Sequence, residues 1–191
     1  SYMGVATPFG AIEFGRTGAL TAGTHGGIVG AMSPFGITWK EGALTKIFAG
    51  NIAARLNNMV KYESPDLSGF KLYAQYSNGV DDDDVVSSQK NRYIAVGATY
   101  RYKNLRLIAA FDNLFYNDSA VKTDAGVAAG KDLKDQRTYN IGGTYDFGDV
   151  RMYLGYQYGQ NIKTPRQGDA KAIAAAKYDS KDSKAAEGYD T

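Results

Sequence analysis

The sequence contains few side chains of the types that perform catalysis. Its single histidine, His25, lies in the glycine-rich segment Gly23-Thr24-His25-Gly26-Gly27, and the chain has no cysteine. A phosphate-binding loop would need a Lys-Ser or Lys-Thr pair after its glycines, and none follows here. A zinc site is not expected with so few nitrogen and sulfur ligands. We therefore predict no catalytic residue, no metal site, no cofactor and no enzymatic activity, and we interpret His25 as a loop-packing residue.

The acidic run Asp81-Asp82-Asp83-Asp84 is the other cluster that could bind a ligand. Consecutive aspartates lack the every-second-residue ligand spacing of a preformed calcium loop. A run of like charges is more typical of a flexible, solvated loop. That interpretation is favoured over a calcium site or a divalent-cation bridge to lipopolysaccharide.

The composition excludes several classes of protein. The 191-residue chain is nearly neutral, with 22 Lys and Arg against 20 Asp and Glu, so nothing indicates a nucleic-acid partner. It holds 15 Tyr and 23 Gly but one Trp, and its mean hydropathy is −0.38. No apolar run approaches the roughly 20 residues of a membrane-spanning helix. Membrane-spanning strands, in contrast, expose only every second residue to lipid, so they can be hydrophilic on average.

Seven segments alternate apolar and polar residues with the period of a β-strand. The predicted strands are Ala11–Arg16, Arg55–Ser64, Phe70–Tyr76, Tyr93–Tyr102, Leu105–Asn113, Tyr139–Phe147 and Val150–Tyr158. The first residues, Ser1 to Val5, are interpreted as the end of an eighth strand. These segments predict an all-β, antiparallel fold.

The connections between the predicted strands alternate in length. Residues 65–69, 103–104 and 148–149 are tight turns suited to hairpins. The long connections are residues 17–54, 77–92, 114–138 and 160–191, the last of which we interpret as a surface loop. Long connections of this kind are uncommon in compact soluble domains. Short turns on one side and long loops on the other are expected when each strand crosses a membrane.

The two faces of the predicted strands differ in composition. One face is apolar and carries aromatic residues near the strand ends, where a girdle would meet the lipid–water boundary. Its aromatic residues are Phe70, Tyr76, Tyr100, Tyr102, Tyr139, Tyr145, Phe147, Tyr156 and Tyr158. The other face is small or charged, as at Gly97, Thr144 and Asp146. A soluble sandwich also alternates, but it requires neither girdles nor asymmetric loops, so a transmembrane barrel is favoured.

The segment from Arg55 to Phe70 resembles a signature of beta-proteobacterial porins. It contains Arg55-Leu56-Asn57-Asn58, then Tyr62-Glu63-Ser64-Pro65, then Gly69-Phe70, which match an Arg-x-Asn-Asn strand, a Tyr-x-Ser-Pro turn entry and a Gly-Phe strand start. Phe9 to Arg16 is similar to the family strand that leads into an inward-folded loop, and Pro34-Phe35-Gly36 resembles the core of that loop. Tyr139 to Gly148 is similar to a later family strand, so the resemblance covers most of residues 1–160.

The resemblance implies a Gram-negative general porin. Such a protein is a homotrimer of 16-stranded barrels in the outer membrane, in contact with lipid and lipopolysaccharide, and each subunit has a water-filled pore for passive diffusion of small hydrophilic solutes and ions. This chain would supply about half of one barrel wall. Two open sheet edges in hydrocarbon would cost several kcal/mol for each unsatisfied backbone group. We therefore interpret the chain as an internal fragment, cut at both ends, whose wall is completed by other strands of the full protein.

The resemblance also implies that residues 17–54 fold into the barrel and narrow the pore, although an extracellular lid is an alternative. The candidate constriction residues are Arg16, Glu41, Lys46, Arg55 and Lys61. Arg55 matches the wall arginine of the family motif, and Lys61 shares its predicted face. Arg16 is two residues from Phe14 and four from Ile12, so regular alternation places its side chain on the same outward face as theirs, unless the strand bends at Gly15.

The charges of these candidates suggest that the pore favours anions. Glu41 is the only acid between residues 17 and 54, and rings of charged side chains set the selectivity of channels. Further pore-lining candidates are Asn57, Lys71, Arg101, Arg106 and Arg151. The four cations among them lie near the short turns and would line the periplasmic vestibule.

Two alternative functions stay open from the sequence. A substrate-specific channel would need an ordered aromatic track, whereas the inward-facing aromatics Tyr73, Tyr93 and Tyr153 are few and scattered. A soluble or surface β-domain that acts as a binding module would explain the alternation but not the aromatic girdles.

Overall fold

The computed structural model of the chain describes residues 1–21, 27–32, 34, 56–80, 91–115, 122–123, 126–127 and 134–161. The strands of this part are β1 (Tyr2–Thr7), β2 (Gly10–Thr17), β3 (Leu56–Glu63), β4 (Phe70–Ser77), β5 (Arg92–Tyr102), β6 (Leu105–Phe115), β7 (Lys122–Thr123), β8 (Gly126–Val127), β9 (Gln136–Asp146) and β10 (Arg151–Gln160). A short 3-10 helix, η1, spans Val29–Met32. Among the described residues, no helix has the length and apolar character needed to cross a membrane.

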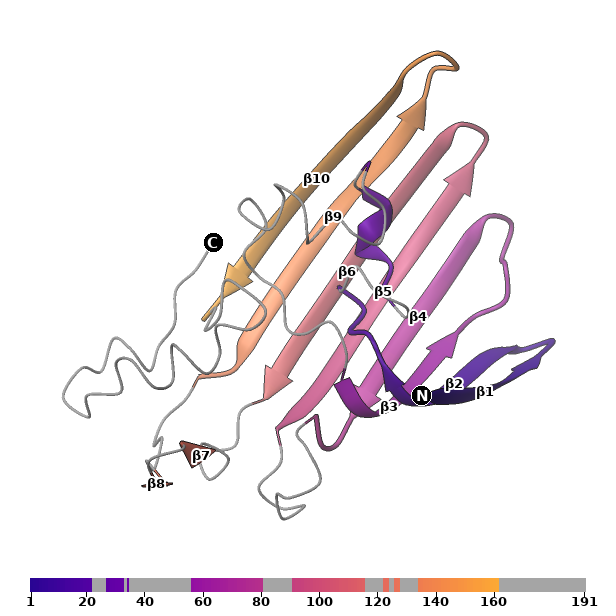
Figure 1. The fold of residues 1–191 in the computed structure, drawn as a ribbon. Helices are drawn as coiled ribbons and strands as arrows, with labels where there is room; N and C mark the ends of the chain where they lie inside the picture. Colours follow the sequence, from indigo (N-terminus) through magenta and orange to yellow (C-terminus); the bar gives the residue numbers. More distant parts are fainter. Residues whose placement is uncertain are drawn as a thin grey trace.

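Eight strands form one antiparallel sheet in the order β1-β2-β3-β4-β5-β6-β9-β10 (Figure 1). Each strand therefore pairs with its neighbour in sequence, except that the small β7–β8 hairpin is inserted between β6 and β9. The predicted all-β antiparallel fold is confirmed, and the seven predicted strands correspond to β2–β6, β9 and β10. β1 continues to Thr7, two residues beyond its expected end, and the β7–β8 hairpin was not predicted.

The short turns are fixed by local hydrogen bonds and by residues with positive φ. In the β3–β4 turn the backbone amide of Gly69 donates to Oδ1 of Asp66 at 2.6 Å, and Gly69 has a φ of 90°. In the β9–β10 turn the amide of Gly148 donates to Oδ1 of Asp146 at 2.9 Å, and Gly148 has a φ of 99°. Glycine adopts this backbone conformation without the steric cost that a Cβ would bring, so both turns can be tight.

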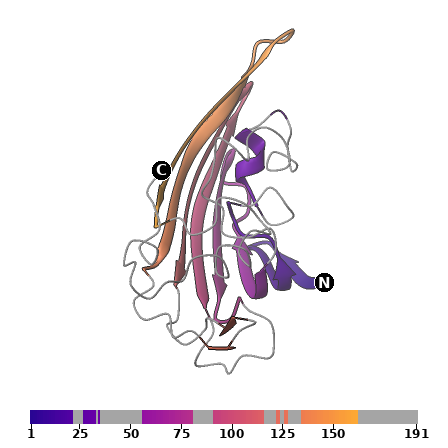
Figure 2. The ribbon, with the colours of Figure 1, turned by 60° about the vertical axis from the view of Figure 1, so that its left-hand side comes forward.

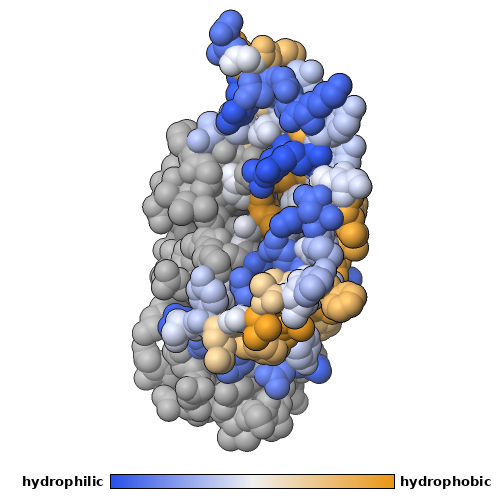
Figure 3. Space-filling model, turned by 90° about the vertical axis from the view of Figure 1, so that its right-hand side faces the viewer, coloured by the Kyte–Doolittle hydropathy of each residue, from blue (hydrophilic) through white to orange (hydrophobic). Residues whose placement is uncertain are grey.

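The outward face of the sheet exposes apolar side chains and the inward face buries polar ones. In β9, Tyr139 and Ile141 are 42% and 60% exposed, whereas Thr138 and Asn140 between them are buried. Leu154 in β10 is 72% exposed. Figure 3 shows hydrophobic residues gathered along one border of the described part, beside a mainly hydrophilic surface. A soluble protein rarely exposes so large an apolar area, and contact with lipid explains it.

Aromatic rings meet on the outward face at two levels of the sheet. Near the short turns, Phe70 lies 6.1 Å from Tyr100 between ring centroids. Toward the opposite ends of the strands, the Tyr139 ring lies 4.9 Å from that of Phe111 and 6.0 Å from that of Tyr158. The two levels match the aromatic girdles of a membrane-spanning sheet.

A β-bulge in β3 changes the faces that alternation predicts. Gly15 pairs with Met59 and Thr17 pairs with Leu56, so three residue steps of β3 lie opposite two of β2. Asn58, within the bulge, has a φ of 53°. Leu56 and Met59 are consequently both buried, at 4% and 1% exposure. Uninterrupted alternation over the predicted strand Arg55–Ser64 would place Leu56 on the outward face with Val60 and Tyr62. That placement is wrong, because the extra residue of the bulge reverses the alternation.

The hydrophobic core lies on the inward face, beneath the segment that follows β2. Residues Ala19, Leu20, Ile28, Val29 and Met32 of that segment pack with Leu56, Met59, Tyr93, Ala95, Ile108, Ala110 and Leu114 of the wall. The helix η1 contacts β6, β9 and β10. Figure 2 shows that the sheet is curved, so that its β1–β2 edge bends toward the side on which η1 lies.

Candidate functional site: the inner wall of the sheet

The buried carboxylate of Asp112 holds the segment after β2 against the wall. Asp112 in β6 has no exposed surface. It accepts hydrogen bonds from the hydroxyls of Thr21, Thr138 and Tyr93, the last at 3.2 Å. The Tyr93 hydroxyl also accepts a bond from the Leu20 amide at 3.0 Å. One carboxylate thus joins three neighbouring strands to residues 20 and 21.

The wall is glycine-rich where the apolar residues of this segment rest on it. A Cβ at Gly97 in β5 would come within 2.9 Å of side-chain atoms of both Leu20 and Ile28. A Cβ at Gly142 in β9 would overlap the sulfur of Met32. The absence of side chains at these two positions therefore lets the segment lie close to the backbone of the sheet.

Charged side chains of alternating sign cross the wall from β2 to β4. The ammonium of Lys61 lies 3.6 Å from a carboxylate oxygen of Glu13 and 3.7 Å from one of Glu63. The other oxygen of Glu63 accepts a hydrogen bond from Lys71 at 2.7 Å. Lys61 is 6% exposed, so water screens its ion pairs less than it would at an open surface.

A second group of charges lies near the short turns. Asp146 in β9 pairs with Arg151 in β10, whose Nε lies 3.0 Å from Oδ2 of the aspartate. Arg101 in β5 and Arg106 in β6 are direct cross-strand partners. Within the described part of the chain, no carboxylate lies within 4 Å of either of these two arginines. Arg101 and Arg106 are therefore the two cations of the described wall strands at this end that have no carboxylate beside them.

The structure places some of the predicted site residues and leaves others outside the described part. Lys61, Lys71, Arg101, Arg106 and Arg151 lie on the inward side, and Asn57 is half-buried, with its carbonyl accepting a bond from Ser77 at 2.7 Å. Glu41, Lys46, Arg55, His25 and Asp81–Asp84 lie outside the described residues, as do residues 162–191 of the last long connection.

Arg16 lies on the side that regular alternation predicts for it. It is exposed, as are Ile12 and Phe14, whereas Thr17 after it is buried. Gly15 has a φ of 126° but does not turn Arg16 inward. The strand geometry gives no support to a role for Arg16 in a constriction.

Three functional candidates were missed in the sequence, namely Glu13, Glu63 and the anchoring role of Asp112. Each of the three lies at a strand position that regular alternation assigns to the inward face, and this alternation could have identified them from the sequence. Their partners lie on other strands, and pairing register decides which charges meet. Among the described residues, no group of three His, Asp or Glu side chains could hold a metal ion.

Comparison with known proteins assigns the sheet to a family. The model of the family described as Gram-negative porin matches residues 1–189. An outer membrane porin protein of Bordetella pertussis is 26% identical over an alignment of 156 residues, which covers 78% of this chain and 38% of that protein. The chain thus spans well under half the length of this curated relative.

The match agrees with the two-faced sheet. The exposed apolar face is the lipid-contacting side of a transmembrane β-barrel wall in the outer membrane, and the polar face with its covering segment is the interior. From this architecture and the family match over nearly the whole sequence, the chain belongs to the Gram-negative porins.

Proposed function

We propose that the protein to which these residues contribute forms a water-filled channel for passive diffusion of small hydrophilic solutes and ions. The observation that carries this proposal is the distribution of side chains on the two faces of the sheet, which is the reverse of that in a soluble protein. Apolar residues such as Leu154 and Ile141 are exposed on the outward face, and the polar residues Thr138, Asn140 and Lys61 are buried on the inward face. A wall of this kind is stable only with lipid on one side and a polar interior on the other. No enzymatic activity is proposed, since the family is one of channels.

We propose further that residues 17–54 form the constriction. In support, the described residues of this stretch pack on the inward face and are anchored there by Asp112. Lys61 on the wall, together with Arg55, Glu41 and Lys46 of the undescribed stretch, are the proposed charged groups around the opening. An external lid would leave Ala19 and Leu20 exposed, whereas both are fully buried.

The proposed pore favours anions. On the strands of the described inward face the cations are Lys61, Lys71, Arg101, Arg106 and Arg151, and the acids are Glu13, Glu63, Asp112 and Asp146. Asp66, in the β3–β4 turn, adds one acid on the Lys71 side of the short-turn end. Asp112 is covered by the anchored segment, and the other three acids of the strands lie beside cations. The charges of the wall strands that remain without a neighbouring carboxylate are therefore those of Arg101 and Arg106, and Lys103 in the adjoining turn adds a further exposed cation.

The partners that we propose are lipid and lipopolysaccharide on the outward face and two further copies in a homotrimer. The apolar outward face supports contact with lipid, and the trimer follows from the resemblance to general porins. A substrate-specific channel is the weaker alternative, because Tyr93, one of the few inward aromatics, is fully buried beneath the covering segment and cannot guide a solute.

The test is planar-bilayer conductance of the full-length protein in a salt gradient. We expect stepwise conductance that closes in threes and a reversal potential on the anion side. Correctly folded protein without conductance would overturn the channel proposal. Conductance with a cation-side reversal potential would keep the channel and overturn the proposed charge preference.

A further inference from the structure

Arg101 and Arg106 form an unusual pair of like charges in the wall. They are direct partners in the β5–β6 ladder, one position from the last pair before the turn, Tyr102 and Leu105. The backbone amide of Arg101 donates to the carbonyl of Gly69, at 2.8 Å, and so points away from β6. The two arginines therefore form a non-hydrogen-bonded pair, the type in which side chains approach most closely.

This arrangement is unfavourable by itself. Like charges directly opposite each other destabilise an antiparallel sheet. Lys61, Lys71 and Arg151 each lie beside a carboxylate, whereas the described residues provide none within 4 Å of Arg101 or Arg106. Arg106 is also half-buried, which weakens the compensation that water can give. A bound anion would offset this repulsion.

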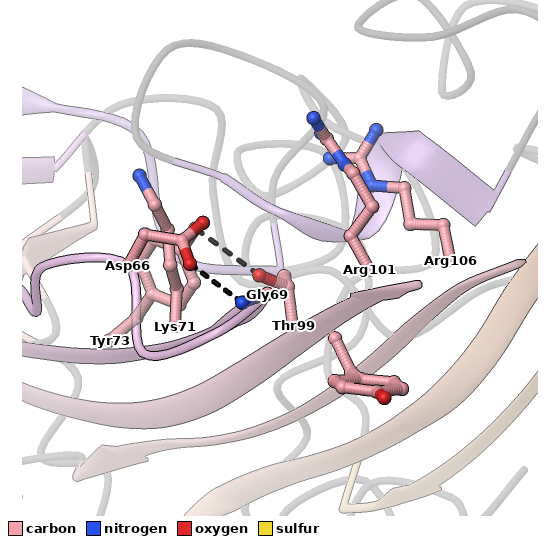
Figure 4. Close-up of a pocket in the computed structure, with 8 residues that line it drawn as sticks. Asp66, Gly69, Lys71, Tyr73, Thr99, Arg101 and Arg106 are labelled. Carbon is pink, nitrogen blue, oxygen red and sulfur yellow. Dashed lines mark hydrogen bonds between the residues drawn. The ribbon is translucent and has the colours of Figure 1, made fainter. Parts of the chain in front are cut away.

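The two arginines border a hollow in the wall of about 240 Å³. Figure 4 shows their guanidinium groups side by side and pointing to the same side of the sheet, with Lys71 across the hollow. Tyr73 and Thr99 line it as well, and their hydroxyl oxygens lie 3.4 Å apart. The lining thus combines two forked cationic donors with two neutral hydroxyls.

We propose that this hollow is a binding site for a tetrahedral oxyanion with two negative charges, such as phosphate or a phosphate monoester. Guanidinium groups bind such oxygens through paired, charge-assisted hydrogen bonds. Two guanidinium groups match the two charges. The hydroxyls of Thr99 and Tyr73 supply one further donor, because in their mutual contact one of them donates to the other. This inference deepens the proposed anion preference and rests on it, and it places a specific site at the short-turn end rather than at the constriction.

Asp66 also lines the hollow and opposes an anion there. Its Oδ1 accepts the Gly69 amide, and Figure 4 shows it on the Lys71 side of the hollow, away from the guanidinium groups. An amide at this position would keep the acceptor for Gly69 and remove the charge. Asp66→Asn is therefore expected to bind the oxyanion more tightly, which a purely structural role of the turn would not produce.

The experiment is equilibrium dialysis of radiolabelled inorganic phosphate against full-length protein, folded in detergent, at constant ionic strength in chloride. We expect saturable binding that Arg101→Gln or Arg106→Gln weakens by about tenfold or more, the usual effect of losing a charge-assisted hydrogen bond. Asp66→Asn should strengthen binding several-fold. The matched control is Arg137→Gln, because Arg137 is exposed in β9 at the parity of Tyr139, on the outward face.

Outcomes for this site and for the channel can be separated on the same preparations. The oxyanion site would be overturned if no saturable binding of phosphate were found. It would also be overturned if Arg101→Gln and Arg106→Gln weakened binding no more than Arg137→Gln does. If conductance is present in the same protein, the channel proposal survives that result. Phosphate binding with no conductance would instead keep the site and overturn the channel. A heat-dependent shift in gel mobility checks that each variant is folded.

Discussion

Asp112 connects the covering segment to the wall through a few hydrogen bonds. Its partners are Thr21 in the segment, Tyr93 in β5 and Thr138 in β9. Removing the carboxylate leaves buried hydroxyls without this acceptor, which costs about 1–3 kcal/mol for each unsatisfied group. The segment can avoid much of that cost by leaving the wall, because its own polar groups then reach water.

Asp112→Ala is therefore expected to release the covering segment while the strands stay paired. Single-channel conductance of the full-length protein should rise, and limited proteolysis should cut between residues 18 and 32. Tyr93→Phe is the graded comparison, because it removes the hydroxyl that bonds Asp112 and the Leu20 amide but leaves the Thr21 bond in place. It should therefore raise conductance less than Asp112→Ala does. Equal conductance and equal protease resistance in wild type and Asp112→Ala would show that this carboxylate does not hold the segment.

Lys61 is the second residue whose effect can be isolated. Lys61→Gln removes the cation between Glu13 and Glu63 and leaves two carboxylates on the inward face. The reversal potential in a salt gradient should move toward the cation side. Arg16→Gln removes the same charge from an exposed position on the outward face of the sheet, so it should leave the reversal potential unchanged. A shift from Arg16→Gln as large as that from Lys61→Gln would contradict the assignment of the two faces.

At the scale of elements, the two glycine turns differ in how much room they leave. Gly69 and Gly148 both have positive φ, but a Cβ at Gly69 would overlap the carbonyl oxygen of Arg101, whereas a Cβ at Gly148 would have no atom within 4 Å. Gly148→Ala should cost about 1 kcal/mol of backbone strain. Gly69→Ala should cost about 3 kcal/mol or more, since the overlap with a fixed backbone atom adds to the strain.

Urea unfolding of the full-length protein in lipid vesicles measures this difference. Gly148→Ala serves as the control for Gly69→Ala, because it introduces the same methyl group at a similar φ. Equal free energies of unfolding for the two variants would mean that the contact between the β3–β4 turn and β5 does not constrain the fold.

The strands were predictable because their two environments impose a two-residue period. In β5 and β9, alternation of residues such as Ile94 with Ala95 and Ile141 with Asn140 specifies both the strand and its faces. The β3 bulge could not be read in the same way, because Asn58 is compatible with either backbone conformation. One extra residue there reverses the side of Leu56.

The candidate site was only partly predictable for a related reason. Parity identifies the inward side of Lys71, Arg101 and Arg106, but it does not give the register between strands. The register decides that Lys61 meets Glu13 and that Arg101 meets Arg106. Sequence spacing therefore locates the charges on a face, whereas pairing determines which of them are neutralised.

At the scale of the whole molecule, the short turns join the strands at one end of the sheet, and the long connections leave and re-enter the sheet at the other end. The β3–β4, β5–β6 and β9–β10 turns share one end of the sheet (Figure 1). In an outer-membrane barrel the short turns face the periplasm. The orientation can be tested directly because residues 1–191 contain no cysteine.

Two cysteine variants should differ in their accessibility to a thiol reagent added outside the cell. They are Asn104→Cys in the β5–β6 turn and Asp83→Cys in the connection between β4 and β5. A membrane-impermeant maleimide too large for the pore, added to intact cells, should label Asp83→Cys and leave Asn104→Cys unlabelled. Both should be labelled once the outer membrane is permeabilised, which controls for the reactivity of each thiol. Labelling of Asn104→Cys in intact cells would reverse the proposed orientation.

The anchor at Asp112 also has a consequence for the order of assembly. Thr21 and Asp112 are 91 residues apart in the chain, and Leu20 and Tyr93 are 73 apart. Contacts between such distant residues carry a larger loop-closure cost than the hairpin contacts between neighbouring strands, so they form after them. The acceptor site is complete only when β5, β6 and β9 lie side by side. We therefore expect a nascent wall to pass through a stage with a wide lumen, which narrows in a late step.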